Sequence, residues 1–243
     1  GIMHIAESLS AHRGVNFFVR KGKDLEERFI GNAYMFTPKD RKALLKIHTN
    51  APDPMAITKP YYDQVKDQDD VTKMQYLDLH LWMAGDILLK ADKMSMANSL
   101  ELRVPFLDKE VMALAQRIPT RYRVIHKPSE SGGTPYITKY AMRLAAKKDT
   151  PPQTAKTAAK KKLGFPVPIR VWLKEDTYYN MVKNTFEGNA AQQFFHTEKL
   201  VQLLNDHRAG KADNSRKIWT VYMFLVWYHV YFESDVIPTK PNV

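Results

Sequence analysis

Residues 86–108 read DILLKADKMSMANSLELRVPFLD, and the fold of the chain is best approached from this stretch. Its first half has helical periodicity and mixes two aspartates and two lysines with small residues and methionines. On an α-helix, Asp86, Lys90, Lys93 and Ala97 share one face. A helix that only filled a core would not need four charges in so short a span. We therefore interpret this segment as a candidate functional helix.

The second half of the segment predicts an extended connection that leads into another helix. Pro105 and a brief alternation of residue types at 100–107 favour an extended or loop conformation. Glu101 and Arg103 lie on the same side of an extended chain, so we expect a buried ion pair. Truncating either partner of a buried pair costs about 3–5 kcal/mol. Asp108 is expected to cap the next helix, which is worth about 1 kcal/mol.

Composition restricts the classes of protein to which the chain can belong. The 243 residues are 44% hydrophobic and 26% charged, which is typical of a folded protein with one large or two small domains. The absence of cysteine excludes a disulfide scaffold, a thiolate zinc site and a cysteine nucleophile. The first residues show no signal-peptide pattern. The longest uncharged apolar run, 218–232, has 15 residues, whereas a membrane span needs about 20. We expect a soluble, cytoplasmic protein without membrane contact.

Helical signals dominate the rest of the chain, and they predict a mainly α fold in one compact unit. Three prolines at 50–60 predict a loop, Gly85 is expected to end a helix, and 121–125 is a candidate short strand. One predicted helix begins directly after Thr37. The other predicted helices cover residues 69–84, 87–98, 109–117, 136–148, 169–173, 175–187, 197–208 and 215–234.

Positive charge is concentrated in one segment. The chain has a net charge of +11, and residues 139–174 hold ten basic residues against a single acid, a net +9. Such a segment is either a phosphate-binding surface or a solvated helix face. Lys162 differs from the other lysines because an apolar, turn-rich stretch, Leu163–Pro166, follows it directly. The eight histidines form no pair with metal-ligand spacing, so we expect no transition-metal site.

Two motifs carry a resemblance to a known family. LLKADKMSMANSLELRVPFLD (88–108) and KKKLGFPVP (160–168) resemble, in order and spacing, the signatures of the glutamine-hydrolysing asparagine synthases. The resemblance extends from about residue 24 to residue 232. It implies that residues 1–243 are the helical C-terminal portion of an α/β synthetase domain, of the adenine-nucleotide alpha-hydrolase-like, ATP pyrophosphatase type.

Several features of that family are missing from this sequence. There is no catalytic cysteine of a glutaminase domain, no Ser-Gly-Gly-x-Asp-Ser loop for pyrophosphate and no acidic stretch after such a loop. The stretch SGGTP at 131–135 lacks the aspartate and the final serine, so we interpret it as a surface loop. The resemblance thus implies that the N-terminal glutaminase and the half with the nucleotide loop are partners absent from this chain. It also implies that the isolated chain is inactive, and it leaves a homodimer open.

The resemblance also implies a reaction. In the family, ATP with Mg²⁺ on its phosphates converts aspartate to β-aspartyl-AMP, and ammonia from glutamine displaces AMP. Lys162 matches the family lysine that contacts pyrophosphate, and it is the candidate catalytic residue. A structural ion-pair role stays open for the candidate aspartate- or ATP-binding residues, which are Asp86, Lys90, Asp92, Lys93, Ser95, Glu101 and Arg103.

Two other interpretations remain. β-Lactam-forming synthetases are similar in architecture and also adenylate their substrate. A basic helical module that binds RNA or another polyanion would explain residues 139–174 but not residues 86–108. Nucleic acid is therefore not an expected partner.

Overall fold

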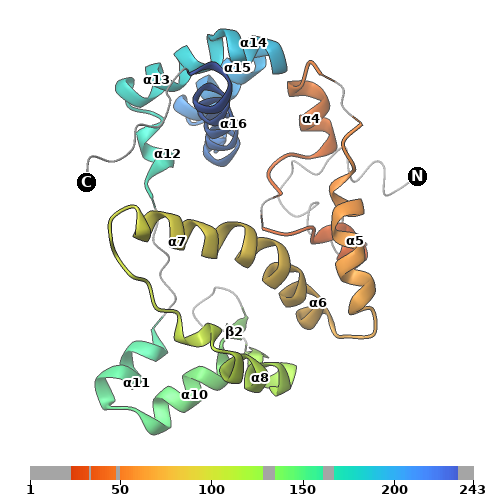
Figure 1. Cartoon of the computed structure of the whole chain (residues 1–243), viewed down its shortest axis with the longest axis vertical. Helices are drawn as coiled ribbons and strands as arrows, with labels where there is room; N and C mark the ends of the chain where they lie inside the picture. The colour runs from red at the N-terminus through yellow and green to blue at the C-terminus, as the bar shows by residue number, and fades with distance from the viewer. Residues whose placement is uncertain (1–22, 33, 48–49, 128–134, 161–166, 235–243) are drawn as a thin grey trace. The chain divides into compact units, whose positions relative to one another are not determined.

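The structure is a computed structural model that describes residues 23–32, 34–47, 50–127, 135–160 and 167–234 (Figure 1). Helices account for most of these residues, and the strands that occur among them form one small antiparallel sheet. The predicted mainly α character is therefore confirmed. The α/β architecture of a larger synthetase domain stays a prediction.

The chain divides into two compact units, which differs from the single unit that the helical pattern predicted. Unit 1 comprises the described residues within Gly1–Ala33 and Pro52–Gly164. Unit 2 comprises the described residues within Tyr34–Ala51 and Phe165–Val243. Periodicity indicates which face of a helix is buried, but not which helices share a core, so the division could not be predicted from it.

Unit 1 contains the signature segment and the small sheet. The two strands pair in antiparallel register, with Ile125 opposite Ile137. Its elements are α3 (Leu25–Arg28), α5 (Pro54–Gln64), α6 (Asp70–Leu77), η1 (Asp78–Leu88), α7 (Leu89–Met96), η2 (Pro105–Leu107), α8 (Lys109–Arg117), α9 (Thr120–Arg123), β1 (Val124–His126), β2 (Tyr136–Thr138), α10 (Tyr140–Asp149) and α11 (Pro152–Ala159).

Helix α5 corrects the prediction of a loop at 50–60. Asp53 caps it by accepting a hydrogen bond from the Met55 amide at 2.9 Å, and Pro54 occupies the first turn, where a missing N–H costs nothing. Pro60 lies inside the helix, at a cost of about 3 kcal/mol. Burial of Tyr62, whose hydroxyl donates to the Phe29 carbonyl at 2.6 Å, helps to offset that cost. The contact between Tyr62 and Phe29 reaches across the sequence, so local composition does not reveal it.

The helix that includes Gly85 continues where a break was predicted. Element η1 is a π-helix, with hydrogen bonds from residue i to i+5, and it runs directly into α7. A glycine inside a helix costs only about 1 kcal/mol, which is too little to end this element. The predicted helix from Ile87 to Asn98 is thus present as the second part of one continuous element.

Side-chain hydrogen bonds join α9 to α6. The Arg123 guanidinium donates to the hydroxyl oxygens of Thr72 and Thr120, at 2.8 and 2.7 Å, and to the Gln75 side chain at 2.7 Å. The predicted strand at 121–125 is displaced towards the C-terminus, because this helical turn comes first and β1 begins at Val124. The predicted helix at 136–148 likewise begins later, at Tyr140, after β2.

The secondary-structure elements of unit 2 are helices in its described residues, apart from one isolated antiparallel β-bridge between Leu45 and Phe195. The predicted helices after Thr37 and over 169–173, 175–187, 197–208 and 215–234 are confirmed. The observed elements are α4 (Pro38–Leu44), α12 (Ile169–Trp172), α13 (Asp176–Glu187), α14 (Asn189–Phe194), α15 (Thr197–Arg208), α16 (Ser215–Tyr228) and η3 (His229–Glu233).

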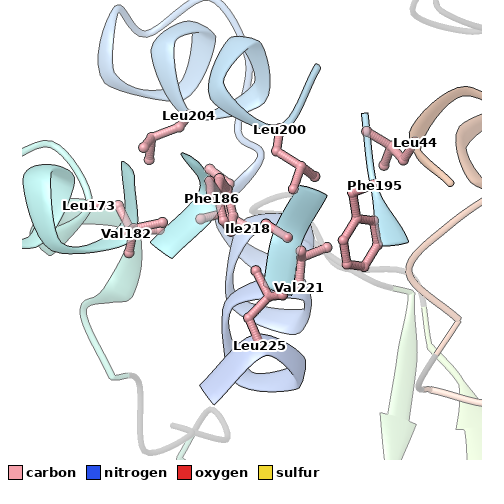
Figure 2. Close-up of a cluster of buried hydrophobic side chains, with 11 residues drawn as sticks. Leu44, Leu173, Val182, Phe186, Phe195, Leu200, Leu204, Ile218, Val221 and Leu225 are labelled. Atoms are coloured by element: carbon pink, nitrogen blue, oxygen red, sulfur yellow. The ribbon is translucent and has the colours of Figure 1, made fainter. Parts of the chain in front are cut away.

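The core of unit 2 lies between α13, α15 and α16. Figure 2 shows Phe186 and Ile218 in the middle of the cluster, with Leu44 and Phe195 at one end. Phe186, Leu200 and Leu204 are fully buried. Backbone hydrogen bonds from Lys46 to Phe194 and from His196 to Leu44 join the α4 segment to this core. None of the helices in the described ranges is long and apolar enough to cross a membrane.

Candidate functional site

The signature segment begins on η1 and continues along α7 (Figure 1). Asp86 is in the π-helical part, where the spacing of an α-helix does not apply. That Asp86 shares a face with Lys90 and Lys93 stays a prediction. Lys90, Lys93 and Ala97 keep α-helical spacing, because α7 and its C-cap have α-helical backbone angles.

Three of the four charged side chains on this helix face solvent. Lys90, Asp92 and Lys93 are exposed, whereas Asp86 and Ser95 are partly buried. The Ser95 hydroxyl donates to the backbone carbonyl of Asp92 at 3.1 Å. Within the described ranges, the side chains of Asp86, Lys90, Asp92 and Lys93 form no ion pair, so an ion-pair network along the helix does not form there. These side chains are thus available to a ligand or to solvent.

Glu101 and Arg103 form the predicted ion pair, with 2.6 Å between the guanidinium nitrogen and the carboxylate oxygen. The prediction that the pair is buried is wrong, since the side chains are 72% and 82% exposed, respectively. The reason is that residues two apart in an extended chain reach each other locally, whereas burial needs a third segment to cover them. The expected cost of 3–5 kcal/mol for truncation does not apply to an exposed pair.

Two local features shape the ends of the extended stretch. Ser99 has φ of 55°, a left-handed conformation that turns the chain away from the end of α7. Asp108 accepts hydrogen bonds from the amides of Glu110 and Val111, at 2.9 and 3.3 Å, and begins α8. The predicted capping role of Asp108 is confirmed. The stretch between these residues is thus fixed at both ends.

Apolar side chains are exposed along the same segment. Phe106 is 67% exposed and Met94 is 61% exposed. Isolated exposed apolar residues are common, but a run along one segment indicates an interaction surface. The exposed apolar side chains of this surface, which we call the signature surface, belong to Ile87, Leu89, Met94, Met96, Leu100, Leu102, Val104, Phe106, Leu107, Val111 and Leu114.

The second motif falls largely outside the described residues. Lys162 lies outside them, as do residues 131–134 of the predicted surface loop. The residues on either side of the gap at 161–166 are described. Lys160 is the C-cap of α11 in unit 1, and Arg170 belongs to α12 in unit 2.

Arg143, on α10, contacts the upstream end of this motif. Its Nε donates to the carbonyl oxygen of Thr138 at 3.0 Å. Its Nη1 donates to the carbonyl oxygens of Ala158 and, at 3.2 Å, Lys160. One partly buried guanidinium thus connects the end of β2 to the end of α11.

His207, on α15, contacts the downstream end. Its ring is buried, Nε2 lies 2.9 Å from the carbonyl oxygen of Arg170, and Nδ1 lies 3.3 Å from the amide nitrogen of Asn214. Because the amide can only donate, Nδ1 accepts, and Nε2 carries the proton that is donated to Arg170. Asp213 lies 3.7 Å from Nδ1.

Neither residue is distinguished by composition or by motif spacing. Arg143 is one of ten basic residues in its segment, and His207 is one of eight histidines without metal-ligand spacing. The sequence does hold a signal for Arg143. Pro151 and Pro152 mark a turn between two helices. Arg143 lies as many residues before Pro151 as Ala159 lies after it. Residues at equal distances from such a turn approach each other when the helices pack antiparallel.

Asp78, at the start of η1, has a perturbed carboxyl group. Burial raises the pKa of Asp78, and a hydrogen bond from the Asn32 side chain, at 3.0 Å, partly opposes that shift. This hydrogen bond ties the segment before α5 to the helix that leads into the signature segment. In the part of the chain that the structure describes, no group of three histidine, aspartate or glutamate side chains could hold a metal ion.

Together these features define a mainly helical protein with a solvent-facing, charged signature helix and a second motif whose flanks are anchored. Comparison with known sequences makes the class specific. The model of the asparagine synthase family matches residues 7–229, and the chain belongs to that family.

Individual relatives agree with this assignment. The chain is 43% identical over 240 residues to a Bacillus subtilis protein named asparagine synthetase [glutamine-hydrolyzing] 1, covering 98% of this chain and 36% of that protein. Provisionally named asparagine synthetases from Mycobacterium bovis and Mycobacterium tuberculosis are 38% identical over 232 residues, covering 93% of this chain and 33% of theirs. The chain therefore spans about a third of the length of these curated relatives. No solved structure gives a significant match.

Proposed function

We propose that this chain acts within a longer protein, called the full-length protein below, that makes asparagine from aspartate at the expense of ATP. The observation that carries the proposal is membership of the asparagine synthase family over residues 7–229. The names of the Bacillus and Mycobacterium relatives support the same activity, with glutamine as the source of ammonia. A β-lactam-forming reaction and polyanion binding have no comparable support.

The proposed reaction has two steps. An oxygen of the aspartate β-carboxylate attacks the α-phosphorus of ATP, the bond to the β-phosphate breaks, and pyrophosphate leaves. Ammonia then attacks the β-carbonyl carbon of β-aspartyl-AMP, and AMP leaves with the attacking carboxylate oxygen. Mg²⁺ enters on the phosphates of ATP as part of the substrate. The site has to neutralise the charge that develops on pyrophosphate and to keep water from the acyl adenylate.

The proposed residue roles follow the two motifs. Lys162 is the catalytic residue, because a lysine ammonium stabilises the negative charge of departing pyrophosphate. The exposure of Lys90, Asp92 and Lys93 supports binding of ligand by α7, since their charges are not used within the described residues. We assign aspartate or ATP binding to Asp86, Lys90, Asp92, Lys93, Ser95, Glu101 and Arg103.

The signature surface supports a place within a larger domain. Its apolar side chains are uncovered by the residues that the structure describes, and the curated relatives are about three times as long as this chain. We propose that the rest of the full-length protein, with a glutaminase and the half that carries the nucleotide loop, covers this surface. On this proposal the two units complete an α/β synthetase domain of the adenine-nucleotide alpha-hydrolase type.

Isotope transfer tests the proposed chemistry. The full-length protein is incubated with glutamine, ATP, Mg²⁺ and aspartate that carries ¹⁸O in its β-carboxylate. We expect one ¹⁸O atom to appear in AMP for each asparagine formed. Unlabelled AMP, or ADP and phosphate as products, would contradict an aspartyl adenylate. The same assay with glutamine replaced by ammonium salt should give the same label, because glutamine only supplies ammonia.

A further inference from the structure

The signature helix α7 ends in a turn whose central residue has a disfavoured backbone conformation. Ser99 has φ of 55°, which lies in the left-handed region. A Cβ atom makes this region unfavourable, whereas glycine adopts it readily. Within the part of the chain that the structure describes, the Ser99 hydroxyl makes no hydrogen bond that would compensate. The side chain of Ser99 therefore does not account for the conformation of its backbone.

Two backbone hydrogen bonds hold this turn. The Ser99 amide donates to the carbonyl oxygen of Met96 at 3.1 Å, and the Leu100 amide donates to that of Ser95 at 2.9 Å. Together they form a Schellman motif, in which the amides of a left-handed residue and of its successor satisfy carbonyls at the end of a helix. The motif joins Ser95, which we assign to ligand binding, to the residue directly before Glu101.

Helix α15 ends in the same motif, and there the left-handed residue is glycine. Gly210 has φ of 74°, its amide donates to the carbonyl oxygen of His207 at 3.1 Å, and the Lys211 amide donates to that of Asp206 at 2.9 Å. The hydrogen bonds of the two turns are the same, so the backbone of α7 does not itself require a serine. The conformation of Ser99 is thus kept against its local preference, as is common at functional sites.

We propose that Ser99 is a positioning residue, whose left-handed turn holds Glu101 at the end of α7 so that Glu101 and Ser95 bind one ligand. The hydrogen bond of the Leu100 amide fixes the point at which the extended stretch leaves the helix. The ion pair with Arg103, at 2.6 Å, then fixes the Glu101 carboxylate on that stretch. The inference rests on the proposed function, because it requires that Glu101 contact aspartate or ATP.

The test compares threonine and glycine at position 99 in the full-length protein. Ser99→Thr keeps the hydroxyl and adds a branch at Cβ, which disfavours the left-handed turn further. Ser99→Gly removes the hydroxyl and keeps the turn. A displacement of about 1 Å can cost about 100-fold in rate, so we expect kcat/KM for pyrophosphate release to fall at least about 10-fold in Ser99→Thr, with respect to aspartate or to ATP. Pyrophosphate release by Ser99→Gly, and glutamine hydrolysis by both variants, should stay within about twofold of wild type.

Gly210→Thr is the matched control, because it puts the same residue into the same turn at the end of α15, where a Cβ atom has room. The control lies outside the signature segment. It should lower the melting temperature at least as much as Ser99→Thr does, while pyrophosphate release stays within about twofold of wild type. Strain in a turn of this kind would then not be sufficient to reduce activity.

Leu100→Pro keeps the experiment decisive where Ser99→Thr does not fold. Proline is common just after the end of a helix, and here it removes the amide that donates to Ser95, so we expect the same selective loss, of at least about threefold. The proposal is overturned when the kinetics of Ser99→Thr match wild type, when Ser99→Gly loses as much activity as Ser99→Thr, or when pyrophosphate release and glutamine hydrolysis fall in equal proportion. Failure of the proposed function gives a different result, namely no aspartate-dependent pyrophosphate release from wild type, and it overturns this inference as well.

Discussion

The buried imidazole of His207 donates a hydrogen bond to the carbonyl oxygen of Arg170, with 2.9 Å between the two atoms. The same ring accepts from the Asn214 amide, so one side chain joins α12, α15 and the start of α16. Arg170 is close in sequence to the end of the second motif. The core of unit 2 therefore reaches the downstream flank of the residues that carry Lys162.

His207→Phe should destabilise unit 2, because it keeps an aromatic ring at the buried site but removes both ring nitrogens. The substitution leaves the Arg170 carbonyl and the Asn214 amide without their buried partner, and each unsatisfied group costs about 1–3 kcal/mol. Urea unfolding of the whole chain, followed by tryptophan fluorescence, measures the loss in the free energy of unfolding. His196→Phe is the control, because His196 is only partly buried. Equal stability of the two variants would contradict the role of His207.

Unit 2 should lose stability when the pH falls below about 4. Burial is the largest influence on Asp40 and would raise its pKa, but hydrogen bonds from Lys217 and Thr37 outweigh it and lower the pKa below 3.8. A hydrogen bond from the Ser215 hydroxyl is the main cause of the lowered pKa of Asp213. A lowered folded-state pKa gives stability that is present above the unfolded-state value and is lost as the pH falls through the folded-state value.

Hydrogen exchange of the α16 peptide between pH 7 and pH 3 measures this dependence, after correction for the intrinsic effect of pH on exchange. Asp40→Asn should reduce protection at pH 7 and make the remaining protection less dependent on pH. A variant with the wild-type pH profile would show that the Asp40–Lys217 pair does not contribute to the stability of unit 2.

Truncation of the Glu101–Arg103 pair should change the stability of this chain very little. Exposed ion pairs are worth about 0–1 kcal/mol, so Glu101→Ala and Arg103→Ala should each fall within that range. Thermal unfolding of the 243-residue chain and its variants provides the measurement. In the full-length protein the same substitutions should lower the rate of asparagine formation, because we assign both residues to substrate binding. A loss of several kcal/mol in the isolated chain would show that the pair is buried in solution.

The isolated 243-residue chain should not make asparagine. It holds the two lysine-containing motifs but neither a phosphate-gripping Ser-Gly-Gly-x-Asp-Ser loop nor a glutaminase cysteine. The measurement is chromatography of amino acids after incubation with aspartate, ATP, Mg²⁺ and ammonium salt, which bypasses the need for glutamine. Asparagine above the level of a heat-denatured sample would contradict the proposal that the rest of the full-length protein completes the site.

Local signals predicted the starts of two helices, α4 and α8. Thr37 and Asp40 form a capping box, and Asp108 caps α8. The sequence reveals such interactions because they join residues only two or three apart. Long-range contacts explain the errors. Pro60 is tolerated inside α5 because Tyr62 is buried against a distant segment, and the Glu101–Arg103 pair is exposed because nothing in the described chain covers it.

From the sequence, the two motifs of the candidate site could be predicted, but not the contacts that hold them. The sequence predicts the Glu101–Arg103 pair and the helical position of Lys90 and Lys93, but not the π-helix that contains Asp86. The anchors of the second motif depend on packing between separate helices. The contacts of His207 therefore became visible only in the structure, whereas the spacing of Arg143 from Pro151 was a signal that the sequence held.

Aspartate-dependent exchange of labelled pyrophosphate into ATP, catalysed by the full-length protein, tests the central claim most directly. Exchange should be readily detectable in wild type and in Lys199→Ala, a matched loss of an exposed lysine in α15. Lys162→Ala should reduce exchange by about 100-fold or more, since electrostatic groups at such sites contribute on this scale, while glutamine hydrolysis is retained. Exchange near the wild-type rate in Lys162→Ala would contradict the role of Lys162. Absence of exchange in wild type would contradict the proposed synthetase reaction itself.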